Sequence, residues 1–259
     1  MANRRWRSRG LGLVAFCLVL RASAVAAAEV TLIGPGGVRT AMMQLIPQFE
    51  KATGNQVKAT FGSGGRTRQQ VIDGGDFDVS IVEPPIDKLI ASGQVIASSQ
   101  TSLAFVPVGV AVKSGAAKPD ISTPEAVKAL LLRAKAISYP NGASGAGAGL
   151  SFDETLRKLG IFDEMRPKIK IAEGGAGAMA LLAKGEVDIG LTYVSEIIPE
   201  PGVDVVGPLP KEISTPTPLL AFISAHAKSA DAAKALVTFL SSDQAAEIYR
   251  RNGYEPASH

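Results

Sequence analysis

Apolar runs typical of β-strands alternate along this chain with amphipathic stretches typical of α-helices. This alternation favours an α/β fold with largely parallel sheets. The predicted strands cover residues 30–33, 57–61, 78–82, 106–112, 136–139, 168–172, 188–193, 203–206 and 219–223. The predicted helices cover residues 40–53, 67–73, 87–92, 124–132, 151–159, 176–184, 230–240 and 243–252.

Four of the strand-to-helix turns are rich in glycine: residues 33–39, 61–71, 139–149 and 172–177. Small residues let the backbone N–H groups of a helix N-terminus approach a ligand, and the helix dipole favours an anion there. The turns therefore predict one cleft, lined by helix N-termini, that holds a small anion.

Two of these turns also carry side chains that suit an anion. In the second turn Ser63 supplies a hydroxyl, while Arg66 and Arg68 supply positive charge with forked donors. Arg39 follows the first turn in the same way. An arginine at a helix N-terminus opposes the helix dipole, so we interpret Arg39 and Arg66 as ligand-binding rather than structural residues.

The first 28 residues have the three parts of a secretory signal. A basic start with four arginines precedes an apolar core at residues 11–20, and Ala26-Ala27-Ala28 forms a small-residue cleavage site. The apolar core is about half the length that spans a bilayer. We therefore predict a signal peptide at residues 1–28, cleavage after Ala28, a periplasmic location and no membrane insertion.

Removing the signal peptide changes the charge balance of the protein. The full chain has 27 basic and 24 acidic residues, but the segment contains five arginines and no acid, so 22 basic residues remain against 24 acidic ones. The balance shifts from +3 to −2, so the basic character gives no argument for nucleic-acid binding. The sole cysteine, Cys17, also leaves with the segment.

The two halves of the mature chain repeat the same rhythm of elements, which predicts two lobes. We expect the chain to cross to the second lobe near Pro107 and to return near Gly207. Residues 29–107 plus 207–259 would then form lobe 1, and residues 108–206 lobe 2. A cleft between such lobes is a favoured place for a small ligand.

Several stretches resemble the type II periplasmic solute-binding proteins, and most closely their molybdate-binding branch. The resemblance covers nearly the whole mature chain and implies a two-lobed fold with a hinge of two crossovers and an interlobe cleft. Its motifs are residues 34–54 with Phe49, residues 61–71 followed by Phe77-Asp78-Val79, the signature around Lys184-Gly185-Glu186-Val187-Asp188, and residues 244–254.

The same resemblance implies which positions hold the ligand. The loop serines of the family correspond to Gly36 or Gly37 and to Ser63, its tyrosine is kept as Tyr193, and its backbone donors correspond to residues 144–147 and 174–177. The predicted ligand-binding residues are Gly37, Arg39, Ser63, Gly65, Arg66, Ser144, Gly175 and Tyr193.

The chain departs from the molybdate-binding pattern by losing hydroxyls and gaining arginines. Arginine pairs with carboxylates through two parallel hydrogen bonds. A dicarboxylate or tricarboxylate therefore fits the predicted loops at least as well as a metal oxyanion such as molybdate.

Two functions stay open. The first is a monomeric receptor that closes over a small anion and delivers it to an ABC transporter, which we prefer because most relatives are receptors. The second is an isomerase on the same fold, since the family includes aconitate isomerase. Glu83 or Tyr193 would then carry the proton in an allylic shift between cis- and trans-aconitate. The simpler interpretation of Glu83, which we favour, is an ion-pair partner for an arginine.

Other chemistry finds little support in the sequence. His226 and His259 are the only histidines, and they form neither a metal site nor a triad. No glycine run continues into a nucleotide-binding motif. We predict no metal and no cofactor.

Overall fold

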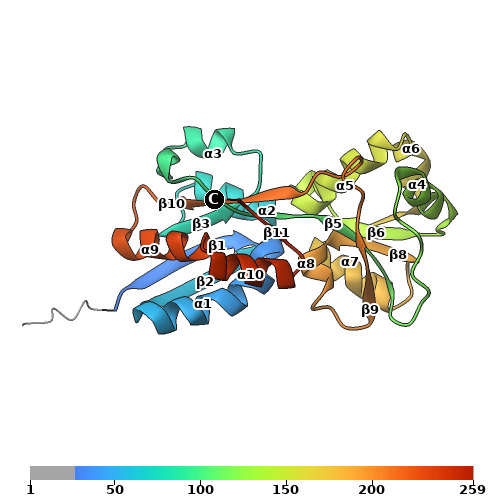
Figure 1. Ribbon diagram of the computed structural model, residues 1–259. Helices are drawn as coiled ribbons and strands as arrows, with labels where there is room; N and C mark the ends of the chain where they lie inside the picture. The colour runs from blue at the N-terminus through green and yellow to red at the C-terminus, as the bar shows by residue number, and fades with distance from the viewer. Residues whose placement is uncertain (1–26, 259) are drawn as a thin grey trace, which may run out of the picture.

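The computed structural model describes residues 27–258 and shows two α/β lobes side by side (Figure 1). The predicted signal segment up to residue 26, and His259, lie outside the described residues. Within residues 27–258, no helix combines the length and the apolar character needed to cross a bilayer.

The first lobe is built on a six-stranded sheet with the order β11-β4-β10-β3-β1-β2. Its strands are β1 (Glu29–Pro35), β2 (Gln56–Gly62), β3 (Val79–Val82), β4 (Thr101–Val106), β10 (Thr217–Ile223) and β11 (Glu255–Pro256). Its helices are η1 (Gly36–Val38), α1 (Arg39–Thr53), α2 (Gly64–Ile72), α3 (Asp87–Ala91), η2 (Ala97–Ser99), α9 (Ala230–Leu240) and α10 (Asp243–Arg251).

The second lobe is built on a five-stranded sheet with the order β7-β6-β8-β5-β9. Its strands are β5 (Val108–Lys113), β6 (Ile137–Pro140), β7 (Ile169–Ala172), β8 (Ile189–Tyr193) and β9 (Val203–Pro208). Its helices are α4 (Pro124–Arg133), η3 (Gly142–Ser144), α5 (Gly147–Lys158), α6 (Phe162–Met165), η4 (Arg166–Lys168), α7 (Gly174–Ala183) and α8 (Val194–Ile197).

Both sheets are mixed, so the prediction of largely parallel sheets is wrong. Parallel pairing joins β1 to β2 and β3, and β6 to β7 and β8. However, β10 returns from the second lobe and pairs antiparallel with β3 and β4, and β5 pairs antiparallel with β8 and β9. These antiparallel strands come from distant parts of the sequence, which local periodicity does not report.

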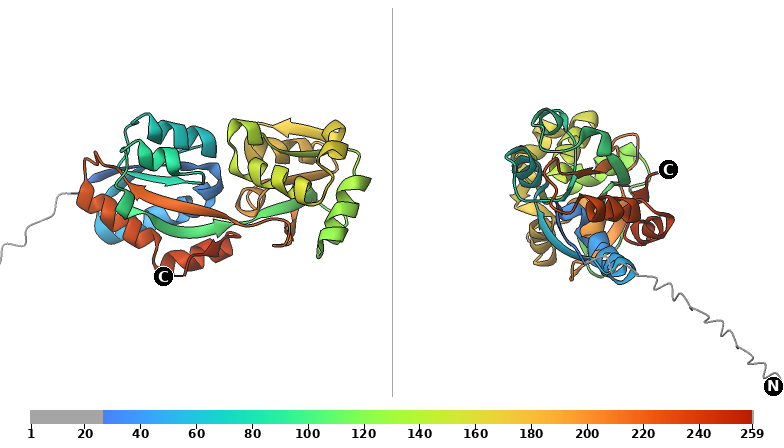
Figure 2. Two further views of the ribbon diagram at one scale, coloured as in Figure 1. Left: turned by 90° about the horizontal axis from the view of Figure 1, so that it is seen from above. Right: turned by 90° about the vertical axis from the view of Figure 1, so that its left-hand side faces the viewer.

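The lobes are connected where the chain crosses between the sheets, as the view from above shows (Figure 2). The predicted strand at residues 106–112 corresponds to β5 and includes only the last residue of β4, a strand that was otherwise not predicted. β4 and β5 belong to different sheets and are separated by Pro107. Proline has no backbone N–H to continue a ladder, which fits a break at this point. The chain returns between β9 and β10. The lobe boundaries at residues 107 and 207 stay a prediction.

Three helices begin earlier than predicted, inside the glycine-rich turns. α2 begins at Gly64 rather than residue 67, α5 at Gly147 rather than 151, and α7 at Gly174 rather than 176. Glycine disfavours the interior of a helix, which is why the sequence pattern excluded these positions. The glycines therefore form the first turns of the helices, where N–H groups lack partners within the helix.

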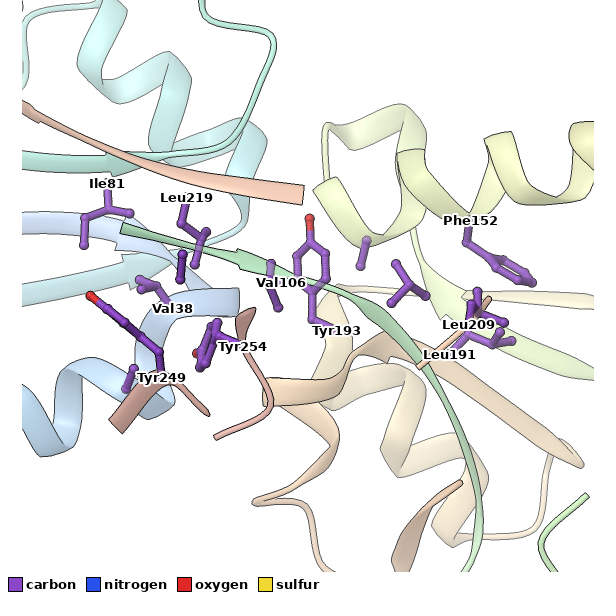
Figure 3. Packing of buried hydrophobic residues seen from close by; sticks show 14 of the residues in the cluster. Val38, Ile81, Val106, Phe152, Leu191, Tyr193, Leu209, Leu219, Tyr249 and Tyr254 are labelled. Carbon is purple, nitrogen blue, oxygen red and sulfur yellow. The ribbon is translucent and has the colours of Figure 1, made fainter. Parts of the chain in front are cut away.

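A single apolar cluster extends through both lobes. It includes Val38, Ile81 and Leu219 in the first lobe, and Phe152 and Leu191 in the second. Figure 3 shows Val106 and Tyr193 between the two groups.

Candidate functional site

The four glycine-rich turns meet at a cleft between the lobes with a volume of about 1000 Å³. Every predicted site residue lines it. From the first lobe come Gly37, Arg39, Ser63, Gly65, Arg66 and Glu83, and from the second come Ser144, Gly175 and Tyr193. Glu173, Glu196 and Glu200 also line the cleft, so glutamates outnumber arginines there.

Arg39 and Arg66 supply the positive charge of the cleft. Both side chains are exposed, and neither forms an ion pair with another residue in the described part of the chain. The Arg39 guanidinium lies over the Phe61 ring, 5.5 Å from its centroid, and donates a long hydrogen bond of 3.4 Å to the Phe61 carbonyl. Both arginines can therefore bind a ligand carboxylate without breaking an existing ion pair.

The two serines of the cleft differ in what they can offer a ligand. Ser63 is the N-cap of α2, where its hydroxyl oxygen accepts from Arg66 N at 3.4 Å. Its O–H stays available as a donor. Ser144 donates its hydroxyl to the Asn141 carbonyl at 2.8 Å and so leaves only acceptor capacity, which does not suit an anion.

Glu83 lies at the base of the cleft, just after β3, and is almost fully buried with 1% exposure. Its Oε2 has no hydrogen-bond partner within residues 27–258. Burial, together with the charge of nearby Glu196, raises the pKa of Glu83 to about 8, although the charge of Arg68 opposes the rise. Glu83 is therefore mostly protonated at neutral pH.

The interpretation of Glu83 as an ion-pair partner is wrong. Arg68 donates to the backbone carbonyl of Glu83 at 3.2 Å, and among the described residues no ion pair involves the Glu83 carboxyl. Arg68 itself is not among the residues that line the cleft.

Tyr193 ends β8 and lies against Gly37, where an added Cβ would approach the tyrosine ring to 2.8 Å. Its hydroxyl is buried and finds no hydrogen-bond partner in the described part of the chain. Burial and the neighbouring Glu83 raise the pKa of Tyr193 well above its usual value, so the phenol is neutral. The two groups affect each other's pKa, although no hydrogen bond of normal geometry joins them.

Glu196 is the residue that the sequence interpretation missed. It lies in α8, three residues after Tyr193, and accepts a hydrogen bond of 2.5 Å from the Thr192 hydroxyl. Burial raises its pKa, while the bond from Thr192 opposes the rise. Its place in the first turn after a strand that ends at the cleft was the signal that could have identified it.

The base of the cleft is fixed by hydrogen bonds to one carbonyl. The oxygen of Gly37 accepts from the Ser195 hydroxyl at 2.9 Å and from the Tyr254 hydroxyl at 2.6 Å. Segments from both lobes and from the C-terminal part of the chain therefore meet at the turn before α1. Across residues 27–258, no group of three histidine, cysteine, aspartate or glutamate side chains is arranged to hold a metal ion.

Two lobes, two chain crossings and an interlobe cleft define the class of two-lobed solute-binding proteins. The family model for bacterial extracellular solute-binding proteins matches residues 30–255, and the chain belongs to this family.

Similar proteins include both an isomerase and molybdate-binding proteins. Aconitate isomerase of Pseudomonas sp is 31% identical over 232 residues, 87% of each chain. The molybdate-binding protein ModA of Escherichia coli is 28% identical over 236 residues, covering 87% of this chain and 88% of ModA. The structure of the periplasmic molybdate-binding protein of Azotobacter vinelandii matches with a TM-score of 0.75 at 21% identity, over 89% of this chain and all of that one.

Proposed function

We propose that this protein is a periplasmic receptor that closes its two lobes over a small polycarboxylate. The observation that carries the proposal is the pair of exposed arginines, Arg39 and Arg66, which line one cleft without ion-pair partners. A planar guanidinium matches a carboxylate with two charge-assisted hydrogen bonds. Ser144, whose hydroxyl is donated to the backbone, argues against an oxyanion held by serine hydroxyls.

The expected role is uptake through an ABC transporter. Family membership supports this role, as does the similarity in fold to the substrate-binding domain of a molybdenum ABC transporter from Clostridium difficile. The secretory pattern of residues 1–28 supports a periplasmic location for the receptor.

A thermal-shift panel of citrate, cis-aconitate, trans-aconitate, molybdate and sulfate tests the proposal. A ligand at 100 times its Kd stabilises the folded state by about 2.7 kcal/mol, a shift of roughly 5 to 10 °C for a protein of this size. We expect such shifts only with polycarboxylates. Stabilisation by molybdate or sulfate alone would overturn the polycarboxylate assignment.

Arg66→Ala should weaken binding of the polycarboxylate by roughly 10- to 100-fold, because one charge-assisted contact is lost. Arg133→Ala is the matched control, since Arg133 is an exposed arginine at the end of α4 and does not line the cleft. Isothermal titration calorimetry measures both. Equal affinities for the two variants would remove Arg66 from the site.

A second candidate function, an aconitate-type isomerase, is favoured by the buried Glu83 carboxyl beside the Tyr193 hydroxyl. In an allylic shift, a base takes a proton from the methylene carbon and the double bond moves by one carbon. A proton is then added at the former vinyl carbon, so atoms and charge balance. A carboxyl whose pKa is about 8 can both take and return a proton near neutral pH.

Incubation of the protein with cis-aconitate, followed by NMR for the trans isomer, separates the two candidates. If the protein is an isomerase, Glu83→Gln should abolish turnover while the variant still binds the tricarboxylate. Tight binding by the wild type without turnover would leave the receptor as the function.

A further inference from the structure

The protein's own carboxyl groups occupy the places where the four glycine-rich turns converge. A Cβ added at Gly64, the first residue of α2, or at Gly147, the first residue of α5, would overlap with Glu83 Oε2. The Glu83 carboxyl therefore lies between two helix N-termini, one from each lobe.

The Glu196 carboxyl group lies between the other two glycine-rich turns in the same way. A Cβ at Gly36, in the turn that leads into α1, would come within 2.9 Å of Glu196 Oε1. A Cβ at Gly175, in the first turn of α7, would overlap with Glu196 Oε2. Gly36 belongs to the first lobe and Gly175 to the second, so this carboxyl also bridges the lobes.

The Gly147 N–H, at the first residue of α5, lowers the pKa of Glu83, though burial raises it by more. The Tyr193 N–H, at the end of β8, acts on the pKa of Glu196 in the same sense. Glu83 Oε2 still lacks a partner although the side chain is 1% exposed. Most buried polar atoms in folded proteins have a hydrogen-bond partner, so an exception such as this one calls for an explanation other than stability.

We infer that Glu83 and Glu196 are specificity residues. Their carboxyl groups fill the space that the four helix N-termini would give to a tetrahedral oxyanion, and so restrict the cleft to ligands that bind through Arg39 and Arg66. This inference rests on the proposed polycarboxylate function for the identity of the accepted ligand, but not for the rejection of oxyanions.

Two physical effects exclude the oxyanion. A carboxyl group fills the volume whether or not it is protonated, and a tetrahedral anion needs donors on every side. Wherever a carboxyl is ionised, it also repels an anion a few ångströms away in a partly desolvated cleft. A polycarboxylate can avoid both effects by placing its carboxylates at the arginines.

The test is oxyanion binding to Glu83→Ala, Glu196→Ala and the double variant, measured by calorimetry with molybdate, sulfate and inorganic phosphate. We expect the double variant to bind at least one oxyanion ten or more times tighter than the wild type. Glu173→Ala is the matched control: Glu173 is an exposed glutamate that lines the same cleft, and its loss changes the charge without emptying a turn. It should gain no oxyanion affinity.

Glu83→Gln and Glu196→Gln keep the volume and remove the charge. If the glutamine variants gain as much oxyanion affinity as the alanine variants, the charge of the carboxyl groups is the main barrier to binding. If only the alanine variants gain affinity, the volume of the carboxyl groups is the main barrier. Folded variants that all fail to bind oxyanions, or a wild type that binds them as tightly, would overturn the inference. Failure of the wild type to bind polycarboxylates would instead overturn the proposed function alone.

Gly64→Ala checks the contact itself through protein stability. The substitution should lower the unfolding temperature in the wild type, because its Cβ overlaps with the Glu83 carboxyl. In the Glu83→Ala background the same substitution should be tolerated. Equal losses in both backgrounds would show that the Glu83 carboxyl does not occupy this helix N-terminus.

Discussion

Glu83 differs from the other residues proposed for the cleft because it is a buried carboxyl that forms no ion pair within residues 27–258. Burial stabilises its protonated form, and the neighbouring Glu196 acts in the same direction. A carboxyl in this state could exclude some anions from the cleft or transfer a proton. It does not stabilise the ligand-free protein at high pH.

The stability of the protein should therefore fall as the pH rises. The pKa of Glu83 is raised from 4.5 in the unfolded chain to about 8 in the folded protein. The stabilisation from its bound proton is complete below the unfolded pKa and is lost as the pH rises through the folded pKa. Urea midpoints measured from pH 5 to 9 should decline for the wild type. The decline should be shallower for Glu83→Gln, and equal slopes for both proteins would contradict the assignment.

A second buried carboxylate connects strands and helices of the first lobe. Its pKa is shifted in the opposite direction to that of Glu83. Burial alone would raise the pKa of Asp78, but hydrogen bonds from Thr31, Lys228 and Ser229 lower it below its usual value. Thr31 N and its hydroxyl each donate at 2.8 Å, and Lys228 N donates at 2.6 Å. One side chain thus connects β1, the start of β3 and the loop before α9.

Asp78→Asn should destabilise the protein by about 2 to 3 kcal/mol, because the amide places a donor against these donors. Asp76→Asn is the control, two residues away. Asp76 contacts the same lysine through an exposed ion pair of 2.8 Å, in which both side chains are 69% exposed. Loss of such a pair costs at most about 1 kcal/mol. Similar unfolding free energies for both variants, measured by urea denaturation, would contradict this role of Asp78.

At the scale of elements, the sequence predicted the helices well where apolar periodicity was strong. α1, α9 and α10 begin and end within about a residue of the predicted bounds. The failures come from interactions that periodicity does not contain. The first turns of α2, α5 and α7 are built from glycines, and the antiparallel partners of β10 lie more than a hundred residues away.

The candidate site was predictable in its position and less so in its chemistry. Glycine runs, arginines, the family resemblance and the position of Glu83 after a strand together predicted nine residues that line the cleft. The partner of a hydroxyl or carboxyl, however, depends on folded geometry. Sequence alone therefore did not show that Ser144 is bonded to the backbone, that Glu83 Oε2 has no hydrogen-bond partner within residues 27–258, or that Glu196 also lines the cleft.

At the scale of the whole molecule, the two lobes meet in a shared apolar cluster and at the Gly37 carbonyl. Hinge closure around a ligand is a common switching mode for such architectures. Gly65 and Gly145 let the two lobes approach closely, because a Cβ on Gly65 would lie 2.9 Å from Gly145 Cα. Larger residues at these two positions would hold the lobes apart.

The shared cluster has a consequence for how the protein melts. Since Val106 and Tyr193 pack between the lobes, unfolding of either lobe would expose apolar surface of the other (Figure 3). Differential scanning calorimetry should therefore show one cooperative transition, with equal calorimetric and van't Hoff enthalpies. Two resolved transitions would contradict this. Such cooperativity means that a ligand bound mainly to one lobe protects both against heat.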